Sequence, residues 1–228
     1  MNSNLVKKVF NRDVLKPSFR APTVAKALTE VGNDNWLSVK RLSDSVIIPV
    51  SKYCRAKDIS FTGTGAGRRE KFTILDSPNK GVQADVTALV DSRSRFVDVA
   101  FNVGAVLEFD YRTKRLTVNP GNVVVAAGFD SSNQLPNGQY LLSQADYPHP
   151  DGANYLHLTS YALTWFFIND TDVLNRYLHV GTYSAGCLTV GENGSDADRR
   201  RWTDIAATLL VQRAADDRYV GKLIVRGL

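Results

Sequence analysis

The chain has 228 residues, of which 43% are hydrophobic and 22% charged, and its eight prolines and sixteen glycines are spread along its length. This is the composition of a globular protein with a real core, and it excludes a disordered or low-complexity chain. Lys and Arg number 28 against 23 Asp and Glu, so the net charge of +5 suits an anionic partner such as nucleic acid, an acidic membrane surface or a bacterial wall.

Residues 1–44 are predicted to be a mostly helical or irregular lead-in. The best helix candidate is Ala21–Val31, because Pro22 suits a first helical turn and Gly32 suits the end of a helix. The first ten residues are not followed by the apolar core of a secretory signal, and no segment of the sequence is apolar enough to predict a transmembrane helix.

From Ser45 the pattern changes to short strands bounded by Gly, Pro, Asn, Asp or Ser, predicted first at residues 46–50, 71–75, 83–90 and 95–101. The alternation along the last of these strands indicates an antiparallel sheet with one solvated face. The glycine-rich Gly63–Arg69 is predicted to be a hairpin loop with solvated arginines, because it lacks the Gly-Lys-Ser/Thr ending of a phosphate-binding loop.

The second half of the chain continues the strand pattern and contains the clearest helix. Strands are predicted at residues 106–111, 115–118, 123–127, 139–142, 155–168, 176–180 and 219–225. The helix begins at a cap on Ser195 or Asp196. Five apolar residues at helical spacing predict the face that packs on the core, namely Trp202, Ile205, Ala206, Leu209 and Leu210.

These elements predict a mainly β (α+β) fold with one amphipathic C-terminal helix. We place the domain boundary near residues 100–105. Residues 1–104 are then a helical lead-in with a β-rich accessory region, and residues 105–228 form the second domain.

The stretch Tyr177–Val190 is where the sequence looks capable of chemistry, because His179 and Cys187 lie on either side of a small, flexible turn. The thiolate is the nucleophilic form of cysteine, and a neighbouring imidazole is the commonest base that generates it near neutral pH. Small residues such as Ser184 and Gly186 leave backbone N–H groups accessible to an oxyanion on an attacked carbonyl. The candidate catalytic residues are therefore Cys187, His179, Gly186 and Ser184.

The two cysteines, Cys54 and Cys187, could form one disulfide, but a chain of this size does not need a bridge and Cys187 has a better use as a thiol. No metal is predicted, since no His or Cys pair has ligand spacing on one element.

Four other residues are weaker site candidates. His149, between two prolines, is predicted in a rigid exposed loop, either as loop structure or in contact with substrate. His157 alternates with apolar neighbours, which is typical of a histidine satisfied within a sheet. Tyr161 or Tyr183 is a candidate for supplying a hydroxyl near the oxyanion and for binding substrate.

Four segments in this order carry a resemblance to a known family, namely residues 107–118, Leu135–Tyr140, Leu178–Thr182 and Ser184–Cys187. They resemble the catalytic domain of L,D-transpeptidases of the YkuD-like kind, which has a strand pair, a Pro-x-Gly-x-Tyr/Phe turn, a histidine followed by a glycine, and a Ser-x-Gly-Cys segment. The resemblance covers roughly residues 105–213. Ala185 stands where a second histidine is usual, and the eight positions from His179 to Cys187 are a short interval, so the chain resembles a divergent member.

The resemblance implies a β-sandwich catalytic domain and a chemistry that needs no cofactor. Cys187 would attack a peptide carbonyl of a peptidoglycan stem, form an acyl-enzyme, and pass the acyl group to an amine or to water. The reaction would be L,D-transpeptidation, D-amino-acid exchange or L,D-carboxypeptidation. His179 would be the base, Gly186 and Cys187 would supply oxyanion amides, and Ser184 would shape the loop.

Such an enzyme is expected to act in the periplasm or cell wall. Without a classical signal, it would leave the cytoplasm through a dedicated machine such as a type VI secretion system, as an antibacterial toxin with an immunity protein as partner. The competing hypothesis is a non-catalytic cell-wall or glycan-binding β protein with a structural cysteine. Neither nucleic-acid binding nor membrane insertion is expected, since the arginines at 199–201 are explained by an amphipathic helix.

Overall fold

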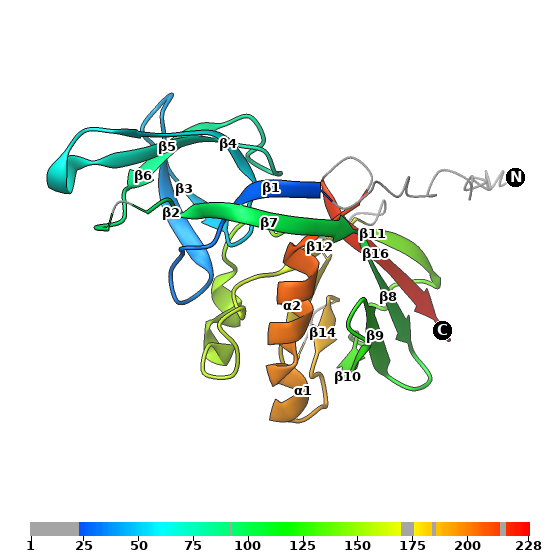
Figure 1. The fold of residues 1–228 in the computed structure, drawn as a ribbon. Helices are drawn as coiled ribbons and strands as arrows, with labels where there is room; N and C mark the ends of the chain where they lie inside the picture. The colour runs from blue at the N-terminus through cyan, green and yellow to red at the C-terminus, as the bar shows by residue number, and fades with distance from the viewer. Residues whose placement is uncertain (1–22, 92, 170–175, 184–185, 215–217) are drawn as a thin grey trace, which may run out of the picture.

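The computed structural model describes residues 23–91, 93–169, 176–183, 186–214 and 218–228. Within them the chain is mainly β, as predicted, with its α-helical segment near the C-terminus (Figure 1). The strands form a closed barrel, a five-stranded sheet and a three-stranded sheet.

Eight strands from the second half of the chain close the barrel in the order β10-β14-β13-β12-β11-β16-β8-β9. The pairs β13 with β14 and β16 with β8 are parallel, and the other neighbours are antiparallel. The β-rich fold expected for residues 105–228 thus takes the form of a closed barrel. Its strands are β8 (Ala105–Asp110), β9 (Arg115–Asn119), β10 (Val123–Gly128), β11 (Gly138–Ser143), β12 (Phe166–Asn169), β13 (Arg176–Val180), β14 (Leu188–Val190) and β16 (Tyr219–Arg226).

The main core forms because alternate residues of the barrel strands are apolar and share a face. Leu107 and Phe109 of β8, and Leu178 and Val180 of β13, are at most 1% exposed. The helical segment, α1 (Asp196–Arg200) and α2 (Trp202–Leu210), adds the predicted apolar face to this core. Ser195 begins α1 as a capping box, which satisfies backbone N–H groups of its first turn.

The first half of the chain supplies a five-stranded antiparallel sheet in the order β3-β2-β6-β5-β4. Its strands are β2 (Trp36–Arg41), β3 (Ile47–Ser51), β4 (Ala56–Thr62), β5 (Arg69–Ile74) and β6 (Gln83–Thr87). The three-stranded sheet has β1 (Thr23–Leu28), β7 (Phe96–Val103) and β15 (Gln212–Arg213), and Figure 1 shows β1 and β7 between the five-stranded sheet and the barrel.

The helix predicted at Ala21–Val31 is wrong where the structure describes it, because residues 23–28 form β1. All six residues of β1 pair with β7, and this long-range pairing outweighs the local helix signals at Pro22 and Gly32. Strands β2 and β4 were also missed within the lead-in and the loop before Gly63.

The long strand predicted at residues 155–168 is also wrong, since only β12 is a strand. A 3₁₀ helix, η2 (Pro150–Tyr155), and turns occupy the rest, and His157 lies on an exposed turn instead of a sheet. Gly152 makes this compact path possible, because a Cβ there would lie 2.0 Å from the Ala162 carbonyl oxygen. Gly63–Arg69 is a hairpin loop as predicted, although Arg69 bonds Asp85 instead of being solvated alone.

The buried apolar residues form two hydrophobic clusters that mostly follow the predicted domain boundary. One contains residues from Leu28 to Phe96, and the other contains Trp36 and residues from Ala105 onward. That the two regions are separate domains stays a prediction. No helix within the described segments is both long and apolar enough to cross a membrane.

A buried ion cluster ties the five-stranded sheet to the C-terminal part of the chain. The Asp76 carboxylate is 1% exposed and accepts hydrogen bonds from Arg55 (2.8 Å) and Arg213 (2.6 Å). Burial alone would raise the pKa of Asp76, but the two guanidinium groups outweigh it and lower the pKa. Arg213 also donates to the Tyr53 carbonyl, so one side chain joins segments that are far apart in sequence.

We expect Asp76→Asn to lower the free energy of unfolding by about 3 kcal/mol, because it leaves two buried guanidinium groups without their counter-charge. Chemical denaturation at pH 7 measures the change. The control is Asp98→Asn, which removes an exposed pair with Lys26 and should change stability by less than about 1 kcal/mol. Equal effects in both variants would contradict the structural role of the cluster.

Candidate active site

The candidate site lies on the face of β12, β13 and β14 that is opposite the barrel core. Leu178 and Val180 belong to the core, so the alternating residues Tyr177 and His179 face the other way. Parallel pairing matches His179 with Thr189 and Leu178 with Leu188. Cys187, the residue before β14, therefore lies beside Tyr177, whose backbone N–H donates to its Sγ at 3.3 Å.

The structure thus brings His179 and Cys187 onto adjoining parts of one parallel strand pair. Cys187 is two residues from the partner of His179, a separation of about 6.6 Å along a strand. Cys187 is half-buried and Cys54 is buried, and both are thiols, so the two cysteines do not share a disulfide. Burial raises the pKa of the Cys54 thiol, which leaves Cys187 as the candidate nucleophile.

The hydrogen bonds of His179 define which ring nitrogen is basic. Nδ1 lies 2.9 Å from the Val180 carbonyl oxygen, which can only accept, so Nδ1 carries the proton. Nε2 then carries the lone pair and accepts from the Thr189 hydroxyl at 3.3 Å. Burial lowers the pKa of His179 to about 4, so the ring is neutral at pH 7.

The backbone conformation just before Cys187 requires glycine at position 186. Its φ is +127°, and a Cβ would lie 2.5 Å from Nδ2 of Asn133. The buried Arg176 donates to the Gly186 carbonyl (3.3 Å) and to the carbonyl and side-chain oxygens of Asn133 (both 2.9 Å). Because the peptide is trans, the Cys187 N–H points away from this guanidinium, as an oxyanion donor beside the thiol requires. Ser184 lies outside the described residues.

A covering segment, residues 144–165 between β11 and β12, packs over His179. His149 and Trp165 of this segment stack with ring centroids 4.4 Å apart, and Trp165 stacks on His179 at 4.1 Å. Tyr155 accepts a hydrogen bond from the Thr182 N–H at 3.0 Å, which joins η2 to the loop after β13. The covering segment therefore buries His179.

The exposed loop predicted for His149 is wrong, because its side chain is buried between Tyr147 and Trp165 and its Nε2 donates to Asp146 at 3.0 Å. Tyr161 is a core residue, and burial raises its pKa to about 12. Tyr183 is 73% exposed on the loop between β13 and β14, and its contact with substrate stays a prediction.

Sequence reasoning missed Trp165, Asp146, Thr189, Arg176 and Asn133. A signal existed for Arg176, which is a charge on the core-facing side of a predicted strand and therefore needs buried partners. Thr189 follows from pairing β13 with β14, which the sequence does not specify.

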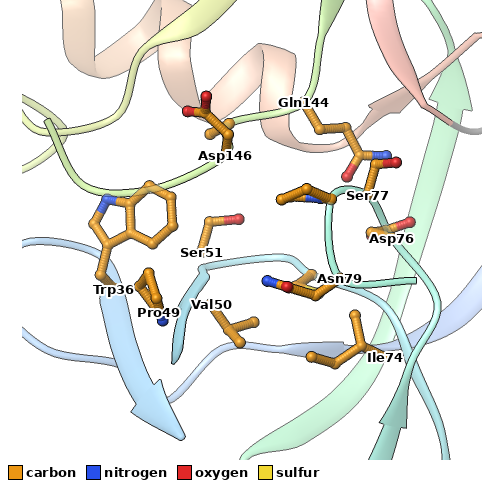
Figure 2. A pocket seen from close by; sticks show the side chains of 13 residues that line it. Trp36, Pro49, Val50, Ser51, Ile74, Asp76, Ser77, Asn79, Gln144 and Asp146 are labelled. Atoms are coloured by element: carbon orange, nitrogen blue, oxygen red, sulfur yellow. The ribbon is translucent and has the colours of Figure 1, made fainter. Parts of the chain in front are cut away.

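A narrow pocket between the covering segment and the five-stranded sheet holds about 260 Å³ of empty space including its mouth. Figure 2 shows Gln144 and Asp146 on one side of it and Val50, Ser51 and Ile74 on the other. Within the described residues no group of three His, Cys, Asp or Glu side chains could hold a metal ion.

No family model matches the chain, and no curated protein matches it. Among solved structures, that of L,D-transpeptidase 1 from Mycobacterium tuberculosis is similar to it with a TM-score of 0.35 and 12% identity, covering 76% of this chain and 99% of that chain. A TM-score this low carries no functional conclusion, so the residues of the site must support any proposal.

The buried neutral His179 should make stability depend on pH. Its pKa is about 4 in the folded protein, below the ordinary 6.5, so the unfolded chain takes up a proton first as the pH falls. The stabilisation is complete above pH 6.5 and is lost towards pH 4. Between pH 7.5 and 4.5 the wild type should lose about 2.5 kcal/mol more than His179→Gln in urea unfolding.

The matched control is His157→Gln, which replaces an exposed histidine and should keep the wild-type dependence on pH. If His179→Gln and His157→Gln behave alike, His179 is not buried in its neutral form.

Proposed function

We propose that the chain is a cysteine-dependent acyltransferase or peptidase that acts on peptidoglycan stem peptides, as an L,D-transpeptidase or L,D-carboxypeptidase would. One observation carries the proposal: the parallel pairing of β13 with β14 brings Cys187 beside Tyr177, two residues along β13 from His179, whose basic nitrogen faces Thr189 of β14. The order of the Leu135–Tyr140, Leu178–Thr182 and Ser184–Cys187 motifs supports the choice of substrate.

The geometry supports a reaction in two halves. Cys187 Sγ attacks the peptide carbonyl while its proton passes to Nε2 of His179, from which the Thr189 hydroxyl is displaced. The negative oxygen of the tetrahedral intermediate accepts from the Cys187 N–H. When the carbon–nitrogen bond breaks, the proton on Nε2 goes to the leaving amine, and a thioester remains on Cys187.

In the second half an amine or a water molecule attacks the thioester. His179 takes the proton of the attacking group and returns it to the departing sulfur. Attack by a second stem amine gives a cross-link, attack by a D-amino acid gives exchange, and attack by water gives hydrolysis. The covering segment limits the entry of water and so bears on this choice.

We propose the periplasm or cell wall as the site of action. We propose that it acts there as a toxin carried by a type VI secretion system and neutralised by an immunity protein in the producing cell. A phage-borne lysin would act on the same substrate.

Cys187→Ala should abolish turnover of purified muropeptides, because the step that forms the thioester is lost. Liquid chromatography with mass spectrometry measures the products of hydrolysis and, with an added D-amino acid, of exchange. Cys54→Ala is the matched control and should retain activity, since that thiol is buried in the other hydrophobic cluster. The proposal is refuted if every product formed by the wild-type protein is also formed by Cys187→Ala.

The competing function, a wall- or glycan-binding protein with a structural cysteine, is tested by alkylation with iodoacetamide. An active site predicts that Cys187 labels faster than Cys54 in the native protein and that His179→Gln slows this labelling, because the imidazole accepts the thiol proton as the new bond forms. Cys54 should label only after unfolding. A Cys187 thiol as inert as Cys54, together with retention on purified sacculi, would favour the binding protein.

A further inference from the structure

We propose that Trp165 and His149 are positioning residues that hold the His179 ring in the orientation the reaction needs. This inference rests on the proposed function of the Cys187 and His179 pair. It assigns a catalytic purpose to the covering segment, which otherwise would only shield the barrel face.

Four rings form a continuous column above β13, in the order Tyr147, His149, Trp165 and His179. Neighbouring centroids lie 4.1, 4.4 and 4.1 Å apart, with interplanar angles of 27°, 5° and 18°. The Trp165 indole is therefore enclosed between two imidazoles, one on each face. A movement of Trp165 would be passed directly to His179.

The column is anchored away from His179 by hydrogen bonds. Trp165 Nε1 donates to the Ala162 carbonyl at 3.0 Å, which fixes the indole in its plane. His149 Nε2 donates to the Asp146 carboxylate at 3.0 Å, and the same carboxylate accepts from the Tyr177 hydroxyl at 3.0 Å. Burial alone would raise the pKa of Asp146, but these bonds, that of His149 foremost, lower it and keep the anchor ionised.

His179 is held by two hydrogen bonds, and the one from the Thr189 hydroxyl to Nε2 must be given up when Nε2 takes the thiol proton. During that step the remaining bond from Nδ1 to the Val180 carbonyl leaves the ring able to tilt about that contact, which would turn Nε2 away from β14. Trp165 covers one face of the ring. A Cβ added at Gly181 would lie 3.4 Å from Cε1 of His179, so Gly181 lies close to the ring edge.

The charged and titratable groups around His179 come from three directions. His149 and Asp151 belong to the covering segment, and they respectively lower and raise the pKa of His179 by their charges. Tyr177 lies two residues away on β13, and Cys187 precedes β14. Removing the indole would expose the imidazole to water, so the ring should lose both its orientation and its desolvation.

The experiment compares Trp165→Leu and Trp165→Phe with Trp36→Leu, which removes another buried indole that does not stack on His179. We expect Trp165→Leu to lower kcat for muropeptides by about 10- to 100-fold with KM within about twofold, because small errors in geometry act on the chemical step. Trp165→Phe should restore most of the rate. Trp36→Leu should keep the wild-type kcat in the folded fraction.

A readout without substrate separates failure of this inference from failure of the proposed function. The chain has three histidines, so NMR with ¹³C-labelled histidine can follow each ring, with His157→Gln used for assignment. Trp165→Leu should move the His179 midpoint from about 4 upwards towards 6.5 and remove the ring-current shift of its Cε1–H signal. It should also slow alkylation of Cys187 at pH 7.

Unchanged kcat, His179 titration and Cys187 alkylation in folded Trp165→Leu would overturn the inference. If that variant does not fold, His149→Leu decides, because it removes the ring that supports the other face of Trp165. Wild-type values in all three measurements would then overturn the inference, and a lowered kcat with a shifted His179 titration would support it. If the wild-type protein has no activity on muropeptides, the His179 titration and the Cys187 alkylation of the variants still test whether Trp165 positions the His179 ring.

Discussion

The parallel pairing of β13 with β14 is the constraint on which the candidate site depends. Parallel neighbours usually need a crossover of a dozen residues or more, but here residues 181–187 are all that separate the two strands. The chain must turn back after Val180 to reach Cys187 beside Tyr177. The eight positions from His179 to Cys187, short for the family this chain resembles, are therefore compatible with a thiol and an imidazole on one sheet face.

Because the crossover is short, few residue types fit at the positions around it. Gly186 adopts a left-handed conformation that a side chain would strain, and Asn133 occupies the space where its Cβ would be. Arg176, at the start of β13, holds the Gly186 carbonyl and Asn133 together. The peptide that presents the Cys187 N–H is thus held by a buried cation from the strand that also carries His179, so one element positions both the proposed base and the proposed oxyanion donor.

Local patterns predicted most barrel strands and the helix after Ser195, because each depends on neighbours in sequence. That Cys187 and His179 act as a pair stays a prediction. Two failures show where such patterns end. Residues 23–28 carry helix signals but form β1 through pairing with β7, and residues 155–168 carry strand-forming residues but turn tightly around Gly152. Trp165, Asp146 and Thr189 were missed for the same reason: contacts between distant elements define them, and Trp165 in a run of aromatic residues looks like core.

The aromatic column creates a conflict between orientation and basicity. Covering His179 fixes its ring but also removes water, which lowers its pKa to about 4 and makes it a weak base at neutral pH. An imidazolium and thiolate pair is disfavoured in such a place, so the proton should leave Sγ only as the new bond to the carbonyl carbon forms. Ala185 stands where the family that this sequence resembles usually has a second histidine, and it supplies no further base. On the proposed mechanism His179 must therefore both take up and return the proton during one reaction cycle.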